Sequence, residues 1–222
     1  MEGLYFKNSP PQMVDICDYH AKISGIKALG YNGGMESINN IKRDEKLFIK
    51  IWTKDRVDTS YSDIRKYIGG VSMDEKSKEQ AQILLKMFEK YDSDYPKDKP
   101  IYRAIRFKKE QDIHNGIFRK LSDFYQSVYV NKELTLIDKA PSSFSKSISV
   151  AKKFGSFTDK RYYTILFIAK NRKSNELDIE EMSHYPEQKE IIVQTHKAQY
   201  KVIDYKINDV NDVLTIELEE VI

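Results

Sequence analysis

The chain has 222 residues and a mass of 26.0 kDa, which is enough for one well-buried core. Its composition, 40% hydrophobic and 32% charged, is that of a folded globular protein and excludes a largely disordered chain. The 37 basic and 34 acidic side chains leave a net charge of +3, which argues against broad, non-specific binding to nucleic acid.

Cysteine usage and hydropathy exclude two further classes of protein. Cys17 is the only cysteine, so an internal disulfide and a cysteine-rich metal cluster are excluded. No apolar run approaches the roughly 20 residues that span a bilayer, and the first residues lack the apolar stretch of a secretory signal. We therefore expect no membrane partner and no signal peptide. The expected location is the cytoplasm where the protein is made, or a host cytoplasm into which it is delivered.

The first part of the chain predicts helices, because its apolar residues recur at intervals of three and four and β-branched runs are scarce. Apolar faces of this kind lie at 13–21, 47–52 and 61–68, the last ending at a glycine pair. The clearest helix is predicted at 74–91, with Asp74 as its N-cap.

Beyond residue 100 the pattern changes to short runs rich in Ile, Val, Tyr and Phe, which predict strands separated by charged turns. The expected strands are 101–107, 127–131, 140–145, 162–169, 189–194, 199–206 and 212–220, with helices at 110–124 and 147–154 between them. Helices followed by strands predict an α+β fold with a mainly antiparallel sheet. We expect one domain over 1–222, mainly helical over 1–95 and mainly β over 96–222.

Several common catalytic motifs are absent from the sequence, including a phosphate-binding loop, H-E-x-x-H and G-x-S-x-G. The four histidines lack metal-ligand spacing and are interpreted as surface or packing residues. Three short stretches on predicted strands remain as candidates: IYRAIRF (101–107), SFSKSISVAKKF (143–154) and YPEQKEIIV (185–193). Each one alone is a weak signal, since short patterns often arise by chance.

The order of these stretches resembles the arginine–serine–glutamate signature of the ADP-ribosyltransferase toxin superfamily. Tyr102-Arg103-Ala104 is similar to the family's aromatic-Arg-Gly at the end of its first core strand. Ser143-Phe144-Ser145, followed by Ala151 and Phe154, resembles the Ser-Thr-Ser strand and the helix after it; Gln188-Lys189-Glu190 resembles Glu/Gln-x-Glu before an apolar strand. The resemblance covers about residues 45–205 and implies a mainly antiparallel, two-sheet core.

Three positions depart from the family pattern. Ala104 replaces a glycine, which restricts how closely a dinucleotide approaches the backbone. Phe144 replaces a threonine, and on an extended strand its side chain is expected to point away from Ser143 and enter the core. Upstream, Tyr61 matches the aromatic position of a family helix, but Arg65 stands where asparagine is usual.

The resemblance implies a mono-ADP-ribosyltransferase that cleaves NAD+ at the nicotinamide–ribose bond, with Glu190 as the key catalytic residue. A carboxylate stabilises the oxocarbenium-like charge that develops on the ribose. Ser143 would orient Glu190, and Arg103 would hold the dinucleotide phosphates with its planar fork of donors. Arg106, three residues further along the strand, is expected to face the opposite side from Arg103.

The substrate implied is NAD+, with no metal. The residues expected to contact NAD+ are Arg103, Tyr102, Ala104, Ser143, Ser145, Tyr61, Arg65 and Phe154. Phe154 is equally consistent with a core position on a short helix.

Gln188 and Tyr185 resemble the acceptor-recognition residues of clostridial Rho-modifying exoenzymes. On a strand, Gln188 would share a face with Glu190, and a neutral amide cannot pair with a guanidinium. The resemblance therefore implies a protein acceptor other than arginine, although a shift of one residue would present Glu187 instead. Nucleic acid stays open as an acceptor, and a monomer is expected.

Two alternative functions stay open from the sequence. A glycohydrolase would use water in place of a macromolecular acceptor. A catalytically silent module would bind nucleic acid or protein through the basic stretch 103–109. The simple architecture is similar to injected effectors and to bacteriophage ADP-ribosyltransferases.

Overall fold

The computed structural model describes residues 36–37, 41–54, 61–71, 74–108, 139–155, 157 and 159–221. The chain divides into two compact units, Met1–Gly34 and Met35–Ile222, and all described residues belong to the second. The helices predicted at 13–21 and 110–124 and the strand predicted at 127–131 lie outside the described residues. Among the residues that the structure describes, no helix is long and apolar enough to cross a membrane.

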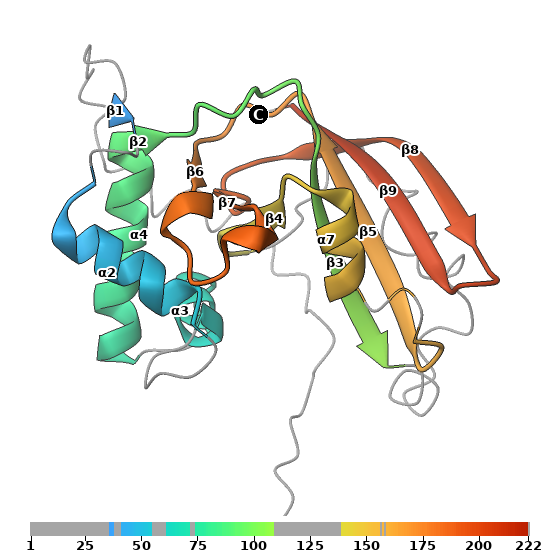
Figure 1. Cartoon of the computed structure of the whole chain (residues 1–222), viewed down its shortest axis with the longest axis horizontal. Coiled ribbons are helices and arrows are strands. Elements are labelled where there is room, and N and C mark those ends of the chain that lie inside the picture. Colours follow the sequence, from blue (N-terminus) through green and yellow to red (C-terminus); the bar gives the residue numbers. More distant parts are fainter. Residues whose placement is uncertain are drawn as a thin grey trace, which may run out of the picture. The chain divides into compact units, whose positions relative to one another are not determined.

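Three helices precede the sheet: α2 (Arg43–Trp52), α3 (Tyr61–Ile68) and α4 (Glu75–Lys90) (Figure 1). All three confirm the sequence prediction. Asp74 caps α4 as expected, because its carboxylate accepts a hydrogen bond from the Ser77 backbone N–H at 2.8 Å. The buried face of α4 has the predicted helical spacing and contains Ser77, Ala81, Leu84, Met87 and Phe88.

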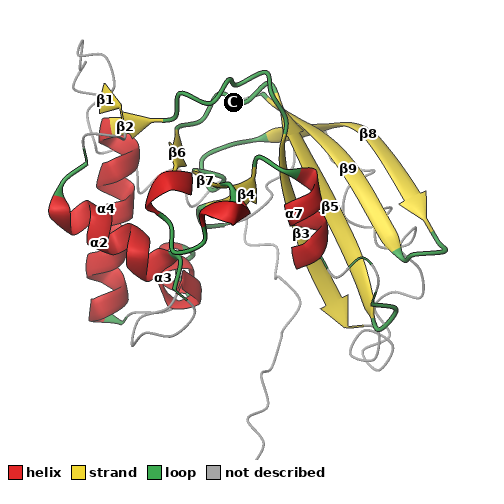
Figure 2. Cartoon of the chain, in the orientation of Figure 1, coloured by secondary structure: helices red, strands yellow, loops and turns green. Residues whose placement is uncertain are grey.

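The sheet strands follow, as Figure 2 shows in yellow. Their bounds are β3 (Ile101–Lys108), β4 (Ser142–Ser145), β5 (Tyr162–Lys170), β6 (Glu176–Asp178), β7 (Glu190–Val193), β8 (Tyr200–Asn208) and β9 (Val213–Glu220). The short elements α7 (Ile148–Phe154), η3 (Glu180–Met182) and η4 (Pro186–Gln188) connect them, while β1 (Glu36–Ser37) and β2 (Tyr91–Asp92) form a separate parallel pair. The sequence did not predict β1, β2, β6 or the two 3-10 helices.

Seven strands form one hydrogen-bonded sheet in the order β6-β7-β4-β3-β5-β9-β8. Among the described pairings of this sheet, only that of β5 with β9 is parallel, so the α+β fold with a mainly antiparallel sheet is confirmed. The division of this core into two sheets, which the resemblance implies, is not confirmed. Strands β3 and β4 share the single register pair Tyr102 and Ser145, so the long strands and the short strands are joined over a very short stretch.

Strand β7 separates two hydrophobic clusters. Ile191 and Val193 pack into a cluster formed by the long strands, while Ile192 packs into a cluster formed mainly by α2, α3 and α4. Because side chains alternate along a strand, Glu190 shares the helical side with Ile192. The first residue of β7 therefore faces the end of α2.

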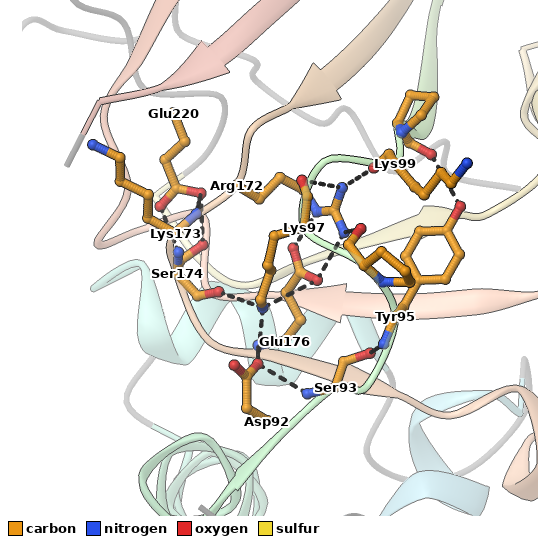
Figure 3. Close-up of polar contacts among 12 residues, drawn as sticks. Asp92, Ser93, Tyr95, Lys97, Lys99, Arg172, Lys173, Ser174, Glu176 and Glu220 are labelled. Carbon is orange, nitrogen blue, oxygen red and sulfur yellow. Dashed lines mark hydrogen bonds and ion pairs between the residues drawn. The ribbon is translucent and has the colours of Figure 1, made fainter.

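A buried ion pair fixes the chain segment that leads from α4 to β3 (Figure 3). Arg172 Nε lies 2.5 Å from Glu176 Oε1, and both side chains are fully buried. The guanidinium also donates to the backbone carbonyls of Pro96, Lys97 and Lys99, while Lys97 Nζ lies 3.3 Å from Glu176 Oε2. The arginine thus holds the turn immediately before the strand that carries Arg103.

Gly155 ends α7 in a space too small for a side chain. A Cβ there would lie 2.7 Å from Thr164 Cγ2, 2.8 Å from the Ala104 Cβ and 2.9 Å from Phe157 Cε2. Gly155→Ala is therefore expected to lower the free energy of unfolding by about 1–3 kcal/mol through overpacking, measured by urea denaturation. Adding Ala104→Gly should recover part of that loss, and an unchanged midpoint for the single variant would contradict the packing.

Candidate active site

A cavity of about 400 Å³ lies where β3, β4 and β7 meet the ends of α2, α3, α7 and η4. It is lined by Trp52, Thr53, Tyr61, Tyr102, Arg103, Ala104, Arg106, Ser143, Phe144, Ser145, Ala151, Phe154, Tyr185, Gln188 and Glu190. The cavity therefore gathers residues from all three stretches that the sequence singled out.

Glu190, Ser143 and Trp52 form a hydrogen-bonded group in this cavity. Trp52 Nε1 lies 3.2 Å from Ser143 Oγ and 3.2 Å from Glu190 Oε1. The Ser143 side chain is also one of the groups that lower the pKa of the Glu190 carboxyl. The strands β4 and β7 bring these residues together, since Ser145 pairs with Glu190 and Ser143 with Ile192.

Glu190 is a buried carboxylate, with 8% of its surface exposed. Burial raises the pKa of Glu190, because the loss of water disfavours the charged form. Hydrogen bonds from Ser143 and Trp52 and the positive charge of Arg103 act in the opposite direction and favour the carboxylate. The site combines a desolvated acid with groups that stabilise its ionised form, an arrangement common among functional carboxylates.

Arg103 links β3 to β4 beside this group. Its Nη1 donates to the Ser143 carbonyl at 2.8 Å, and the side chain is half-buried. Arg106 was expected on the opposite side of β3, but both arginines border the cavity. The described pairing of β3 with β4 is confined to Tyr102 and Ser145, so the part of β3 that carries Arg106 is not covered by β4. The Arg106 guanidinium stacks over the Tyr162 ring, at 5.0 Å from its centroid, whereas the Arg103 guanidinium lies close enough to act on the charge of Glu190. Arg103 is therefore the group in this cavity that suits an anionic ligand.

Ala104 and Phe154 line the side of the cavity formed by α7. The Cβ of Ala104 points to Gly155 at the end of that helix, so the missing side chain of Gly155 accommodates the alanine. Phe154 is 53% exposed and lines the cavity, so the alternative that places it in the core is wrong. Phe144 packs with the long strands at 3% exposure, which confirms the predicted core position.

Gln188 lies in a turn and not on the strand, which corrects the sequence expectation. Lys189 has the left-handed conformation (φ 51°), and β7 begins at the next residue. Ser145 Oγ donates to the Gln188 carbonyl at 2.7 Å, which fixes the turn against β4. Gln188 and Tyr185 still line the cavity through the turn, whereas Glu187 is exposed and does not line it.

Of the two α3 residues expected to contact NAD+, Tyr61 lines the cavity and Arg65 does not. Tyr61 lines the cavity and meets the Trp52 ring edge-on, with 4.6 Å between ring centroids. Arg65 lies outside the cavity lining; its guanidinium stacks over Tyr61 and donates to the Pro141 carbonyl at 3.0 Å. In this structure Arg65 holds the start of β4.

Trp52 and Thr53 line the cavity although the sequence analysis assigned neither of them to the site. Trp52 was recognised only as part of an amphipathic helix, although it is the single tryptophan of the chain. Thr53 Oγ1 donates to the Ile49 carbonyl and accepts from the His184 backbone N–H at 3.2 Å. Their polar contacts join α2 to segments more than ninety residues away, which periodicity alone does not reveal.

No protein-family model matches the sequence, and no curated protein matches it either. Solved structures do match. The Vis toxin, an ADP-ribosyltransferase from Vibrio splendidus, has 15% identity and a TM-score of 0.54, with 83% of this chain and 76% of that chain covered. The C3 exoenzyme of Clostridium limosum has 15% identity and a TM-score of 0.57, covering 82% and 87%. The S. aureus protein C3stau2, solved with NAD, has 17% identity and a TM-score of 0.58, covering 82% and 88%. At this level of identity the likeness establishes the fold, and the chain has the fold of the ADP-ribosyltransferase toxins.

Proposed function

We propose that this protein is a mono-ADP-ribosyltransferase that cleaves NAD+ and transfers ADP-ribose to a protein side chain. The observation that carries the proposal is the meeting of Arg103, Ser143 and Glu190 around one cavity, in the order of the family signature. A chain of the same fold was solved with NAD, which supports the dinucleotide as substrate.

Each of these side chains has a distinct part in the proposed reaction. The nicotinamide–ribose bond breaks with its electron pair leaving on nicotinamide, so positive charge develops at the ribose C1′ and ring oxygen. The Glu190 carboxylate stabilises this charge at close range. Arg103 binds the diphosphate, and Ser143 keeps the carboxylate in its reactive orientation. The acceptor then bonds to C1′ and releases its proton.

The acceptor is proposed to be a protein side chain other than arginine. Gln188 reaches the cavity from the η4 turn, beside Tyr185, which is 38% exposed. An exposed aromatic ring offers contact area to a second macromolecule, while the amide donates and accepts hydrogen bonds without charge. A neutral amide of this kind fits an amide or hydroxyl acceptor better than a guanidinium.

Gln188→Ala is expected to suppress transfer to the acceptor by roughly tenfold or more, while background hydrolysis of NAD+ changes much less. The reason is that Gln188 lines the cavity, while the Glu190 side chain is held by other residues. Transfer is measured as label from NAD+ on protein in a cell lysate, and hydrolysis as free ADP-ribose without lysate.

Glu187→Ala is the matched control, because Glu187 lies in the same turn but outside the cavity lining. It should leave both rates nearly unchanged. Equal losses of transfer and hydrolysis in Gln188→Ala would contradict an acceptor role. Free ADP-ribose with no labelled macromolecule in any lysate would favour the glycohydrolase alternative.

A further inference from the structure

Trp52 is placed so that its one polar atom meets both strands of the site. The side chain comes from the last residue of α2 and is 3% exposed. Its Nε1–H points between Ser143 Oγ on β4 and Glu190 Oε1 on β7, at 3.2 Å from each. The indole is therefore a shared donor to two side chains that the proposed reaction uses.

Contacts on several sides fix the orientation of this indole ring. Tyr61 packs edge-on at 4.6 Å between ring centroids, and Phe48 packs at 5.8 Å from one helical turn earlier. Thr53, the next residue, ties the end of α2 to the segment before η4 by accepting the His184 backbone N–H. An aromatic side chain with two torsions that is held in this way has little freedom to turn its N–H elsewhere.

We infer that Trp52 is a positioning residue for the proposed reaction: its indole N–H holds the Ser143 hydroxyl and the Glu190 carboxylate in one fixed arrangement. This inference rests on the proposed function, because it assigns the role through Glu190. It adds the last residue of α2 to Arg103, Ser143 and Glu190, which all lie on strands.

The chemistry of indole suits this task. Its N–H donates and cannot accept, so it favours the carboxylate over the carboxylic acid, whose oxygens are weaker acceptors. Unlike lysine or arginine, it carries no charge, so it orients the carboxylate without neutralising the negative charge that must face the ribose. The donor is also preorganised in a buried place, where a hydrogen bond to a charged group is strong.

The charged and polar groups around Glu190 come from several elements. Arg103 of β3 contributes positive charge, Ser143 of β4 and Trp52 of α2 contribute hydrogen bonds, and Tyr61 and Tyr185 line the same cavity. Removing the indole N–H takes away one interaction that lowers the pKa of Glu190. The carboxyl would then hold its proton to a higher pH.

The single tryptophan permits a test that changes only this donor. The protein is produced in a tryptophan auxotroph with benzothienylalanine, in which sulfur replaces the indole N–H and the ring shape is kept. A ring-fluorinated tryptophan, which keeps the N–H, is the matched control. Trp52→Phe also removes the N–H, together with part of the ring, and circular dichroism checks that each protein is folded.

Loss of the N–H is expected to lower kcat for NAD+ consumption by roughly tenfold or more, with little change in KM. The acidic limb of the pH–kcat profile should move to higher pH, because the pKa of Glu190 rises. The fluorinated protein should match the unsubstituted one in both respects. Carbon-13 NMR of labelled glutamate follows the Glu190 pKa without any need for turnover.

The outcomes separate this inference from the proposed function. If the unsubstituted protein consumes NAD+ and benzothienylalanine leaves kcat and the acidic limb unchanged, the inference is wrong and the proposed function stands. If the unsubstituted protein does not consume NAD+, the proposed function is wrong. In that case the Glu190 pKa still tests the link between Trp52 and Glu190. An unchanged pKa in the benzothienylalanine protein overturns that link, and a raised pKa supports it.

Discussion

Glu190→Gln is expected to lower the rate of NAD+ consumption by at least about two orders of magnitude, because the amide removes the negative charge that stabilises the developing oxocarbenium ion. Glutamine keeps the size of the side chain and an oxygen that can accept from Trp52 Nε1, which lies 3.2 Å from Glu190 Oε1. NAD+ should still bind, so the loss should fall on kcat. Turnover is measured as released nicotinamide, and binding by calorimetry.

The same substitution should not destabilise the fold. Burial raises the pKa of Glu190, so the folded chain keeps this proton over a pH range in which the unfolded chain has lost it. Stability therefore falls as the pH rises from the unfolded pKa through the folded one. Above that window the neutral amide avoids the cost of burying a charge, and thermal unfolding of Glu190→Gln should occur at the same temperature as wild type or higher.

Two results would reject this role for Glu190. One is turnover in Glu190→Gln that stays within a few-fold of wild type. The other is a folded Glu190→Gln protein, with a thermal transition like that of wild type, whose loss appears in NAD+ binding and not in kcat. The wild-type pH profile gives a further check, because activity should decline as the pH falls through the raised pKa of Glu190.

Arg172→Leu is expected to lower the free energy of unfolding by about 3–5 kcal/mol, since it leaves the Glu176 carboxylate buried without its guanidinium partner. Glu176 has no exposed surface, and Lys97 at 3.3 Å is then its nearest remaining cation. The leucine also removes the donors to the backbone carbonyls of the turn before β3. Chemical denaturation followed by circular dichroism gives the measurement.

Two further variants make the stability test specific. Arg172→Leu combined with Glu176→Leu removes both charges and should recover much of the loss. Arg161→Leu, at an exposed ion pair with Asp159, should leave the unfolding midpoint essentially unchanged. A small effect for Arg172→Leu alone would contradict the importance of the buried pair.

Local patterns were sufficient for most of the described fold. The capped helix α4 and the strands β3, β5 and β9 lie within a residue or two of their predicted bounds, because apolar periodicity and capping act over a few neighbouring residues. Strand β6 has three residues and was missed, since so short a run carries no periodicity.

The candidate site was predicted only in part, for a physical reason. Short motifs placed Arg103, Ser143 and Glu190 in sequence, and the structure brings them to one cavity. Trp52 joined the site through a tertiary hydrogen bond, which no local pattern encodes. Gln188 was assigned to a strand because the left-handed turn at Lys189 was not anticipated: lysine is an unusual residue for that conformation.

The position of β7 between two hydrophobic clusters limits how far the chain can be shortened. A fragment that starts after α4 would lack the helices that cover Leu177, Ile179 and Ile192. The same cut would remove the indole above Glu190 and admit solvent to the carboxylate. The strands that carry Arg103, Ser143 and Glu190 are therefore not sufficient to form this site on their own. The helices are needed as well, because they keep solvent away from the Glu190 carboxylate.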